Sequence, residues 1–140
     1  MSKLVFADAH YWIATVKKND QWHAAARAAK RAVDPAVLVT TDEVLIEFLT
    51  ALGNCGEHLR QQAGKMVRAI LQDPNVRVLP QSRQSFLQGV QLYEQRPDKD
   101  YSLTDCISIC TMKSEAVTEV LTNDHHFEQE GFTVLIKAPG

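Results

Sequence analysis

The sequence predicts an α/β domain in which a small, mainly parallel β-sheet is covered by helices on both faces. Two observations carry this prediction. Short apolar segments rich in Val and Leu alternate along the chain with longer helical segments, as expected for parallel strands that are buried on both sides. Helix-breaking residues, such as the Asp34-Pro35 pair, separate the segments.

Size and composition indicate one globular domain over residues 1–140. The chain has 45% hydrophobic and 23% charged residues, which are ordinary proportions for a folded domain. A chain of this length buries roughly two thirds of its surface on folding and needs no disulfide or structural metal. The formal charge of −2 predicts no global positive field, so any polyanion site must be local. Cys55, Cys106 and Cys110 are odd in number and lack CxxC spacing, which favours a reducing cytoplasm.

The first half of the chain alternates strand and helix. The predicted elements are a strand at 4–7, helices at 9–16 and 22–33, a strand at 36–40 and a helix at 42–52. Thr41 has the character of a helix N-cap, and Gly53 that of the residue just past a helix end. The apolar run before Asp8 is only four residues long, too short for a signal peptide or a membrane span. We therefore expect a soluble protein.

The second half continues the same alternation. The predicted elements are helices at 57–72, 82–96, 102–113 and 125–129 and strands at 76–79, 117–121 and 132–136. The helix at 57–72 is stopped by Asp73-Pro74. No repeat, linker or low-complexity segment interrupts the pattern.

Four carboxylates are predicted to meet at one edge of the sheet. Ligands of open parallel sheets bind beyond the carboxyl ends of the strands. Asp8 closes the first strand, Asp124 follows the fourth, Glu47 lies on the helix after the second strand, and Asp105 lies on the helix before the fourth. Their mutual repulsion calls for a cation, and oxygen ligands suit Mg²⁺ or Mn²⁺.

Each acid also has a purely structural interpretation. Asp8 and Asp124 suit turn or N-cap positions, and Asp105 stands three residues after Ser102 in the S-x-x-D form of a capping box. Glu47 repeats with Glu43 at helical spacing, as in a solvated stripe. From the residues alone, both interpretations stay open.

Other motifs point to packing. His125 and His126 are neighbours on a turn and are expected to cap or line a loop, since sequence neighbours seldom bind one ion together. Cys106 and Cys110 lie four apart on one helix, as expected of core residues. The chain has no HExxH, GxSxG, GxGxxG or GxxxxGK[ST] motif.

Four stretches in the right order and spacing resemble the PIN-domain family and, within it, the VapC-like ribonuclease toxins. They are LVFADAHYWIA (4–14), VTTDEVLIEFLTAL (39–52), DYSLTDCISICTM (100–112) and LTNDHHFEQEGF (121–132). The resemblance implies a three-layer α/β/α Rossmann-like PIN fold with a small parallel sheet. It also implies an acidic cluster of Asp8, Glu47, Asp105 and Asp124 that binds Mg²⁺ or Mn²⁺ and cleaves RNA, with Thr104 as the accompanying hydroxyl residue.

The resemblance further implies the toxin of a type II toxin-antitoxin pair, with an RNA substrate, a cognate antitoxin and a homodimer. Tyr11, Trp12 and Trp22 are candidate surfaces for association, with core packing as the alternative. One departure from the family is Ala9, where a Thr or Ser usually follows the first Asp. Two rival hypotheses remain: a catalytically weak PIN-like module that binds RNA or protein, and an unrelated Rossmann-like domain whose acids all serve as caps.

Overall fold

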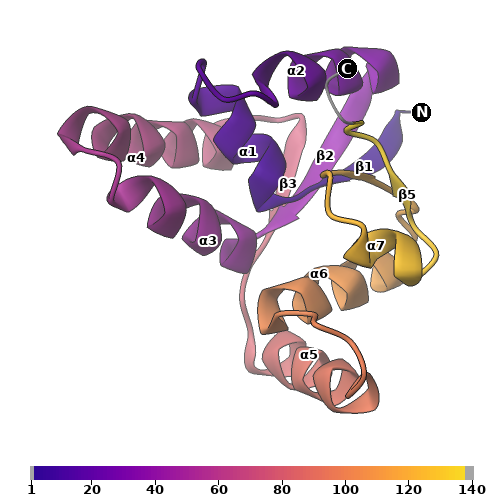
Figure 1. Cartoon of the computed structure of the whole chain (residues 1–140). Coiled ribbons are helices and arrows are strands. Elements are labelled where there is room, and N and C mark those ends of the chain that lie inside the picture. The colour runs from indigo at the N-terminus through magenta and orange to yellow at the C-terminus, as the bar shows by residue number, and fades with distance from the viewer. Residues whose placement is uncertain (1, 138–140) are drawn as a thin grey trace.

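The computed structural model describes residues 2–137 and contains a five-stranded sheet with helices between the strands (Figure 1). The strands are β1 (Lys3–Ala7), β2 (Ala36–Thr41), β3 (Val76–Leu79), β4 (Glu119–Leu121) and β5 (Thr133–Val134). The helices are α1 (Ala9–Val16), α2 (His23–Val33), α3 (Asp42–Gly53), α4 (Glu57–Gln72), α5 (Arg83–Gln95), α6 (Leu103–Ser114) and α7 (His126–Gln129).

All the strand pairs run parallel, in the order β3-β2-β1-β4-β5. The chain first builds the sheet outward from β1 through β2 to β3, and then crosses to the opposite side of β1 to add β4 and β5. Because crossovers between parallel strands are right-handed, this reversal puts α1 to α4 on one face and α5 to α7 on the other, as Figure 1 shows. The predicted three-layer α/β/α architecture is confirmed.

The reversal creates a switch point between β1 and β4. The register pairs Ala7 with Leu121, so the residues that follow them, Asp8 and Thr122, meet just beyond the sheet. The Asp8 N–H donates to the Leu121 carbonyl at 3.3 Å and holds the two chain segments together. Loops at such a switch point diverge and leave a crevice, where ligands bind in open α/β sheets.

The core is built from the strands and the inward faces of the helices. Val5, Phe6 and Val39 in the sheet are fully buried, and Phe48 of α3 and Met112 of α6 pack on the opposite faces. Gly89 permits close packing of α5 on α6, since a Cβ at this position would lie 2.5 Å from Ile107 Cγ1. A side chain at residue 89 would therefore separate two helices that border the crevice.

The predicted elements are all present, with small shifts at their ends. Thr41 caps α3 as predicted, because its hydroxyl accepts from the Val44 N–H at 3.1 Å. Gly53, expected just past the helix, is instead its last residue. The last two strands are shorter than predicted, and Val117 at the start of the predicted fourth strand instead donates its N–H to the Met112 carbonyl of α6 at 2.9 Å.

The aromatic residues proposed for association lie in the core. Tyr11 is 6% and Trp12 4% exposed, and the Trp12 indole N–H donates to the Thr40 hydroxyl at 3.4 Å. Trp22 is half-buried and packs edge-on against His10. The core-packing alternative is therefore correct for Tyr11 and Trp12, and neither offers a surface to a partner.

Cys106 is buried and Cys110 half-buried, as expected of core residues, and the three cysteines are free thiols. Between residues 2 and 137, no helix combines the length and the apolar character that crossing a membrane requires.

Candidate metal centre at the switch point of the sheet

Asp8 is a buried carboxylic acid at the carboxyl end of β1. It occupies the N-cap position of α1 with extended backbone, yet its side chain makes no capping hydrogen bond. Asp8 Oδ2 instead accepts a hydrogen bond of 3.0 Å from the hydroxyl of Thr122. The side chain therefore points toward the end of β4, and the capping interpretation is wrong for this residue.

Burial raises the pKa of Asp8 from 3.8 to about 7, and the negative charges of Glu47 and Asp105 add to the rise. The Ala9 backbone and the Thr122 hydroxyl lower the pKa and oppose the shift only in part. A carboxyl group with this pKa is protonated in a large fraction of molecules near neutral pH. A bound cation would return it to the ionised form.

The Asp105 side chain takes part in a helix capping box with Ser102 and also lies close to the charge of Asp124. Ser102 Oγ accepts from the Asp105 N–H at 3.0 Å, and Asp105 Oδ2 accepts from the Ser102 N–H at 3.1 Å, so the predicted capping box is present. Nevertheless, burial and then the charge of Asp124 raise the pKa of Asp105, against the lowering effect of the Ser102 N–H. Because a carboxylate has two oxygens and about four lone-pair sites, capping leaves Asp105 able to bind a cation.

Asp124 lies in the turn between β4 and α7. Its Oδ1 accepts from the His126 N–H at 3.0 Å, and its own N–H donates to the Thr122 hydroxyl at 3.2 Å. The predicted turn role of Asp124 is therefore confirmed. The same two hydrogen bonds fix its carboxylate beside Asp105.

His126 joins these two acids, which the sequence did not predict. Its Nδ1 lies 3.2 Å from Asp124 Oδ1 and 3.5 Å from Asp105 Oδ2. Side-chain ligand atoms of Asp105, Asp124 and His126 all lie within 4.8 Å of one another. His126 Nδ1 is buried and has no hydrogen-bond partner among residues 2–137. His126 lines the β4–α7 turn as expected, and the turn at Asp124 also brings its ring beside the two carboxylates. The Asp-x-His spacing was the available signal for this second feature.

Glu47 is on the exposed side of α3, yet it belongs electrostatically to the cluster. Desolvation makes the largest contribution to raising the pKa of Glu47, and the charges of Asp105 and Asp124 add to it. Glu47 is therefore exposed, as the solvated-stripe interpretation expects, and also close enough to Asp105 and Asp124 to feel their charges. Asp8, Glu47, Asp105 and Asp124, from four separate segments, thus affect one another's pKa values, whereas the group of the described residues whose ligand atoms come within 4.8 Å of one another consists of Asp105, Asp124 and His126.

The two threonines near the acids make different contacts. Thr104, the predicted hydroxyl residue, is half-buried and lines a pocket beside the acids, and its hydroxyl makes no hydrogen bond to the four acids among the described residues. Thr122 is fully buried and bridges Asp8 and the Asp124 backbone. A hydroxyl residue at the end of a strand, next to a candidate acid, was the signal for Thr122.

The donor set suits a divalent cation. Carboxylate oxygens are the ligands that Mg²⁺ and Mn²⁺ prefer, and an imidazole nitrogen is compatible with a transition metal. The unpartnered His126 Nδ1 and the raised pKa values of Asp8, Glu47 and Asp105 indicate a site whose charge and hydrogen bonding are incomplete by themselves.

Comparison with solved structures finds the same architecture in several bacterial proteins. VapC20 from Mycobacterium tuberculosis, a Sarcin-Ricin loop cleaving toxin, matches with a TM-score of 0.83 and 25% identity, over 95% of this chain and 99% of that one. A DNA-bound VapBC from Salmonella typhimurium matches in fold with a TM-score of 0.65 and 15% identity, over 96% of this chain and 97% of that one. FitAcB from Neisseria gonorrhoeae matches with a TM-score of 0.67 and 14% identity, over 94% and 96%.

No curated protein sequence matches the chain. The family model of the PIN domain matches residues 5–132, which include all four acids, the last three residues of β1 and all of β4. The chain therefore belongs to the PIN-domain family and has the fold of the VapC toxins.

Proposed function

We propose that this protein is a divalent-metal-dependent endoribonuclease that hydrolyses RNA phosphodiester bonds, and that it is the toxin of a type II toxin-antitoxin pair. The observation that carries the proposal is the convergence of Asp8, Glu47, Asp105 and Asp124 at the switch point. Three of these acids have raised pKa values, and the charges of their neighbours contribute to each. Repulsion among these carboxylates destabilises the folded protein, whereas a metal-dependent enzyme needs such a cluster to bind its cation.

Asp8, Asp105 and Asp124 would hold Mg²⁺ or Mn²⁺, with His126 as an additional donor. When bound, the ion would supply Lewis acidity that polarises a phosphodiester oxygen and lowers the pKa of water. Its positive charge also explains how a protein with a formal charge of −2 accepts a polyanion at this edge.

The surrounding residues orient these acids. The Thr122 hydroxyl fixes one oxygen of Asp8, the Ser102 N–H fixes one of Asp105, and the His126 N–H fixes one of Asp124. Ligand orientation by hydrogen bonds of this kind lowers the reorganisation needed during reaction. Glu47, on the exposed side of the cluster, is placed to accept a proton from an attacking water or to help hold a second ion.

A catalytically weak module that binds RNA or protein is the alternative. Ala9 favours it, because the hydroxyl that usually follows the first acid of the family is missing. The hydrogen bond from Thr122 to Asp8 favours the enzyme, since it supplies a hydroxyl to the same carboxylate from the neighbouring strand.

The partners we propose follow from the similar structures. VapC20 is described as a toxin that cleaves the Sarcin-Ricin loop, and VapBC complexes are among the similar folds. We infer an RNA substrate, a cytoplasmic location and a cognate antitoxin that covers the acidic edge. A homodimer is supported by Ile46 and Leu49 of α3, which are 52% and 37% exposed.

Cleavage of RNA by the purified protein tests the enzyme proposal. We expect Mn²⁺-dependent cleavage that stops on adding EDTA and is abolished in Asp105→Asn, which keeps an oxygen able to accept from the Ser102 N–H. Asp98→Asn, on an exposed loop carboxylate, is the matched control and should cleave normally. If Asp105→Asn instead cleaves normally, Asp105 serves only in the capping box and the enzyme proposal fails.

A further inference from the structure

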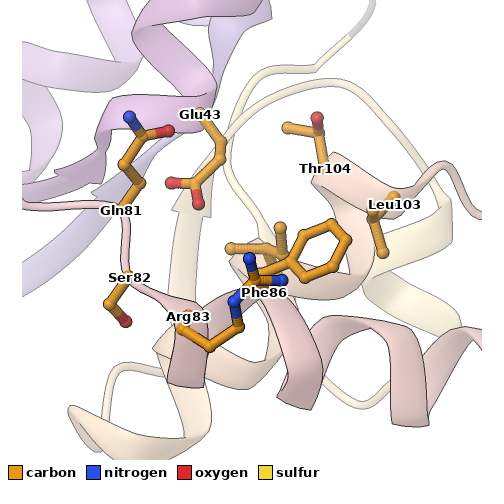
Figure 2. A pocket seen from close by; sticks show the side chains of 8 residues that line it. Glu43, Gln81, Ser82, Arg83, Phe86, Leu103 and Thr104 are labelled. Carbon is orange, nitrogen blue, oxygen red and sulfur yellow. The ribbon is translucent and has the colours of Figure 1, made fainter.

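A pocket of about 650 Å³ lies beside the acidic cluster and is not used by the proposed metal centre. Figure 2 shows Glu43 and Gln81 on one side of it, Leu103 and Thr104 on the other, and Phe86 with Arg83 between them. The walls come from α3, from the loop between β3 and α5, and from the beginnings of α5 and α6.

Phe86 and Arg83 give this pocket an aromatic surface with an adjoining positive charge. Phe86 is 40% exposed although it is a large apolar residue. The Arg83 guanidinium carbon lies 5.6 Å from the centre of the Phe86 ring, within the range of a cation–π contact. Arg83 is the only basic residue among those that line the pocket, and it begins α5, where the helix dipole disfavours a cation. Its position is therefore not explained by helix stability.

The pocket adjoins the acidic cluster through two helices. Thr104 lines the pocket and immediately precedes Asp105 on α6. Glu43 lines the pocket and lies four residues before Glu47 on α3, a separation of about one helical turn, or ~5.4 Å along the axis. The pocket and the acids are thus consecutive parts of one surface.

Hydrogen bonds hold the loop that forms the wall of the pocket. The Gln81 N–H donates to Asp42 Oδ2 at 2.9 Å and ties the loop to the start of α3. A capping box between Ser82 and Ser85 fixes the start of α5. The pocket is therefore formed before any ligand arrives, which reduces the entropy lost on binding.

We propose that this pocket binds one unpaired nucleobase of the RNA strand, next to the phosphodiester that is hydrolysed at the acidic cluster. The base stacks on the face of Phe86, Arg83 contacts the adjoining phosphate, and Glu43 accepts from an exocyclic amino group. Aromatic stacking and a nearby cation are the usual means of binding single-stranded RNA, and carboxylates accept from base amino groups. The inference deepens the proposed function and rests on it.

Binding of a fluorescent single-stranded RNA by the Asp105→Asn protein, followed by anisotropy, tests the inference without cleavage. Stacking contributes enough to each base that Phe86→Ala should weaken binding at least about fivefold, and Phe86→Tyr should restore it. Leu87→Ala is the matched control, because Leu87 is also exposed on α5 and does not line the pocket. Its affinity should equal that of the parent.

The dependence of binding on salt separates the two side chains. Loss of one phosphate contact should reduce the slope of log K against log salt by about 0.7 in Arg83→Gln, whereas Phe86→Ala should leave the slope unchanged.

Equal affinities of Phe86→Ala, Leu87→Ala and the parent for the RNA would overturn the inference, while cleavage by the wild-type protein would still support the enzyme. Conversion of a dimer to a monomer by Phe86→Ala, measured by sedimentation, would also overturn it and assign the pocket to an interface between copies. If the parent binds no RNA and wild-type protein cleaves none, the proposed function fails first and the inference with it.

Discussion

Asp8 couples the acidic cluster to the stability of the fold. Its pKa of about 7 in the folded state exceeds its ordinary value of 3.8, so the folded protein binds more protons than the unfolded chain between these two pH values. The free energy of unfolding therefore falls as pH rises from about 4 to about 7, and the contribution of Asp8 is flat on either side of this range. The sign is opposite to that of an acid stabilised by a salt bridge.

We predict that Asp8→Asn removes much of this pH dependence. The metal-free variant should be more stable than the wild-type protein above pH 7, by an amount on the order of a few kcal/mol, and about equally stable near pH 4. Urea unfolding at a series of pH values, with EDTA present, measures both. Lower stability of Asp8→Asn above pH 7 would show that the ionised carboxylate supports the fold.

His126 and His125 differ in environment although they adjoin in sequence. His126 is half-buried with Nδ1 between Asp105 and Asp124, whereas His125 is exposed. We predict that His126→Ala weakens Mn²⁺ binding about tenfold or more, and that His125→Ala leaves it within twofold of wild type. Equal affinities of the two variants, measured by competition with a fluorescent metal indicator, would remove His126 from the site.

Helix α3 carries two carboxylates on the same face, one turn apart, that have different neighbours. Glu47 interacts with Asp105 and Asp124, and Glu43 lines the neighbouring pocket. We predict that Glu47→Gln impairs cleavage more than Glu43→Gln, chiefly through kcat, while Glu43→Gln acts through KM. Steady-state kinetics on one oligonucleotide separates the two effects, and equal losses of kcat would contradict this assignment of Glu47.

Comparison of the predicted and observed ends of the helices shows which sequence signals are sufficient to place them. Thr41 and Ser102 were recognisable as caps because capping depends on residues three positions apart. Gly53 was misplaced because a glycine can equally end a helix or follow it, and packing of α3 against α4 makes that choice. Tyr11 and Trp12 were ambiguous because two adjacent aromatic residues cannot be assigned to core or surface without knowing what covers both sides of α1.

Across the whole molecule, strand order decides how much of the site was predictable. Strand ends identified Asp8 and Asp124, and the reversal of strand order beside β1 places the strands that precede them side by side. His126 and Thr122 were missed because their roles depend on side-chain direction in the β4–α7 turn. The Phe86 pocket was missed because it is assembled from three stretches of chain, and the stretch that carries Arg83 and Phe86 has no motif of its own.

The proposed toxin role predicts a cellular phenotype. Expression of the wild-type protein in a bacterium should arrest growth, and co-expression of the small open reading frame beside its gene should restore it. Asp105→Asn, expressed to the same level, should permit normal growth. Normal growth with soluble wild-type protein that cleaves RNA in vitro would contradict the toxin role and leave a ribonuclease of another purpose.

Calorimetric titration of the metal-free protein with Mn²⁺ is the most direct test of the acidic cluster as a metal centre. Binding should be saturable, should strengthen as pH rises toward and past 7 because Asp8 must lose its proton, and should be lost in Asp105→Asn. No saturable heat at any pH between 6 and 8, or identical binding by wild type and Asp105→Asn, would contradict a metal centre formed by Asp8, Asp105 and Asp124.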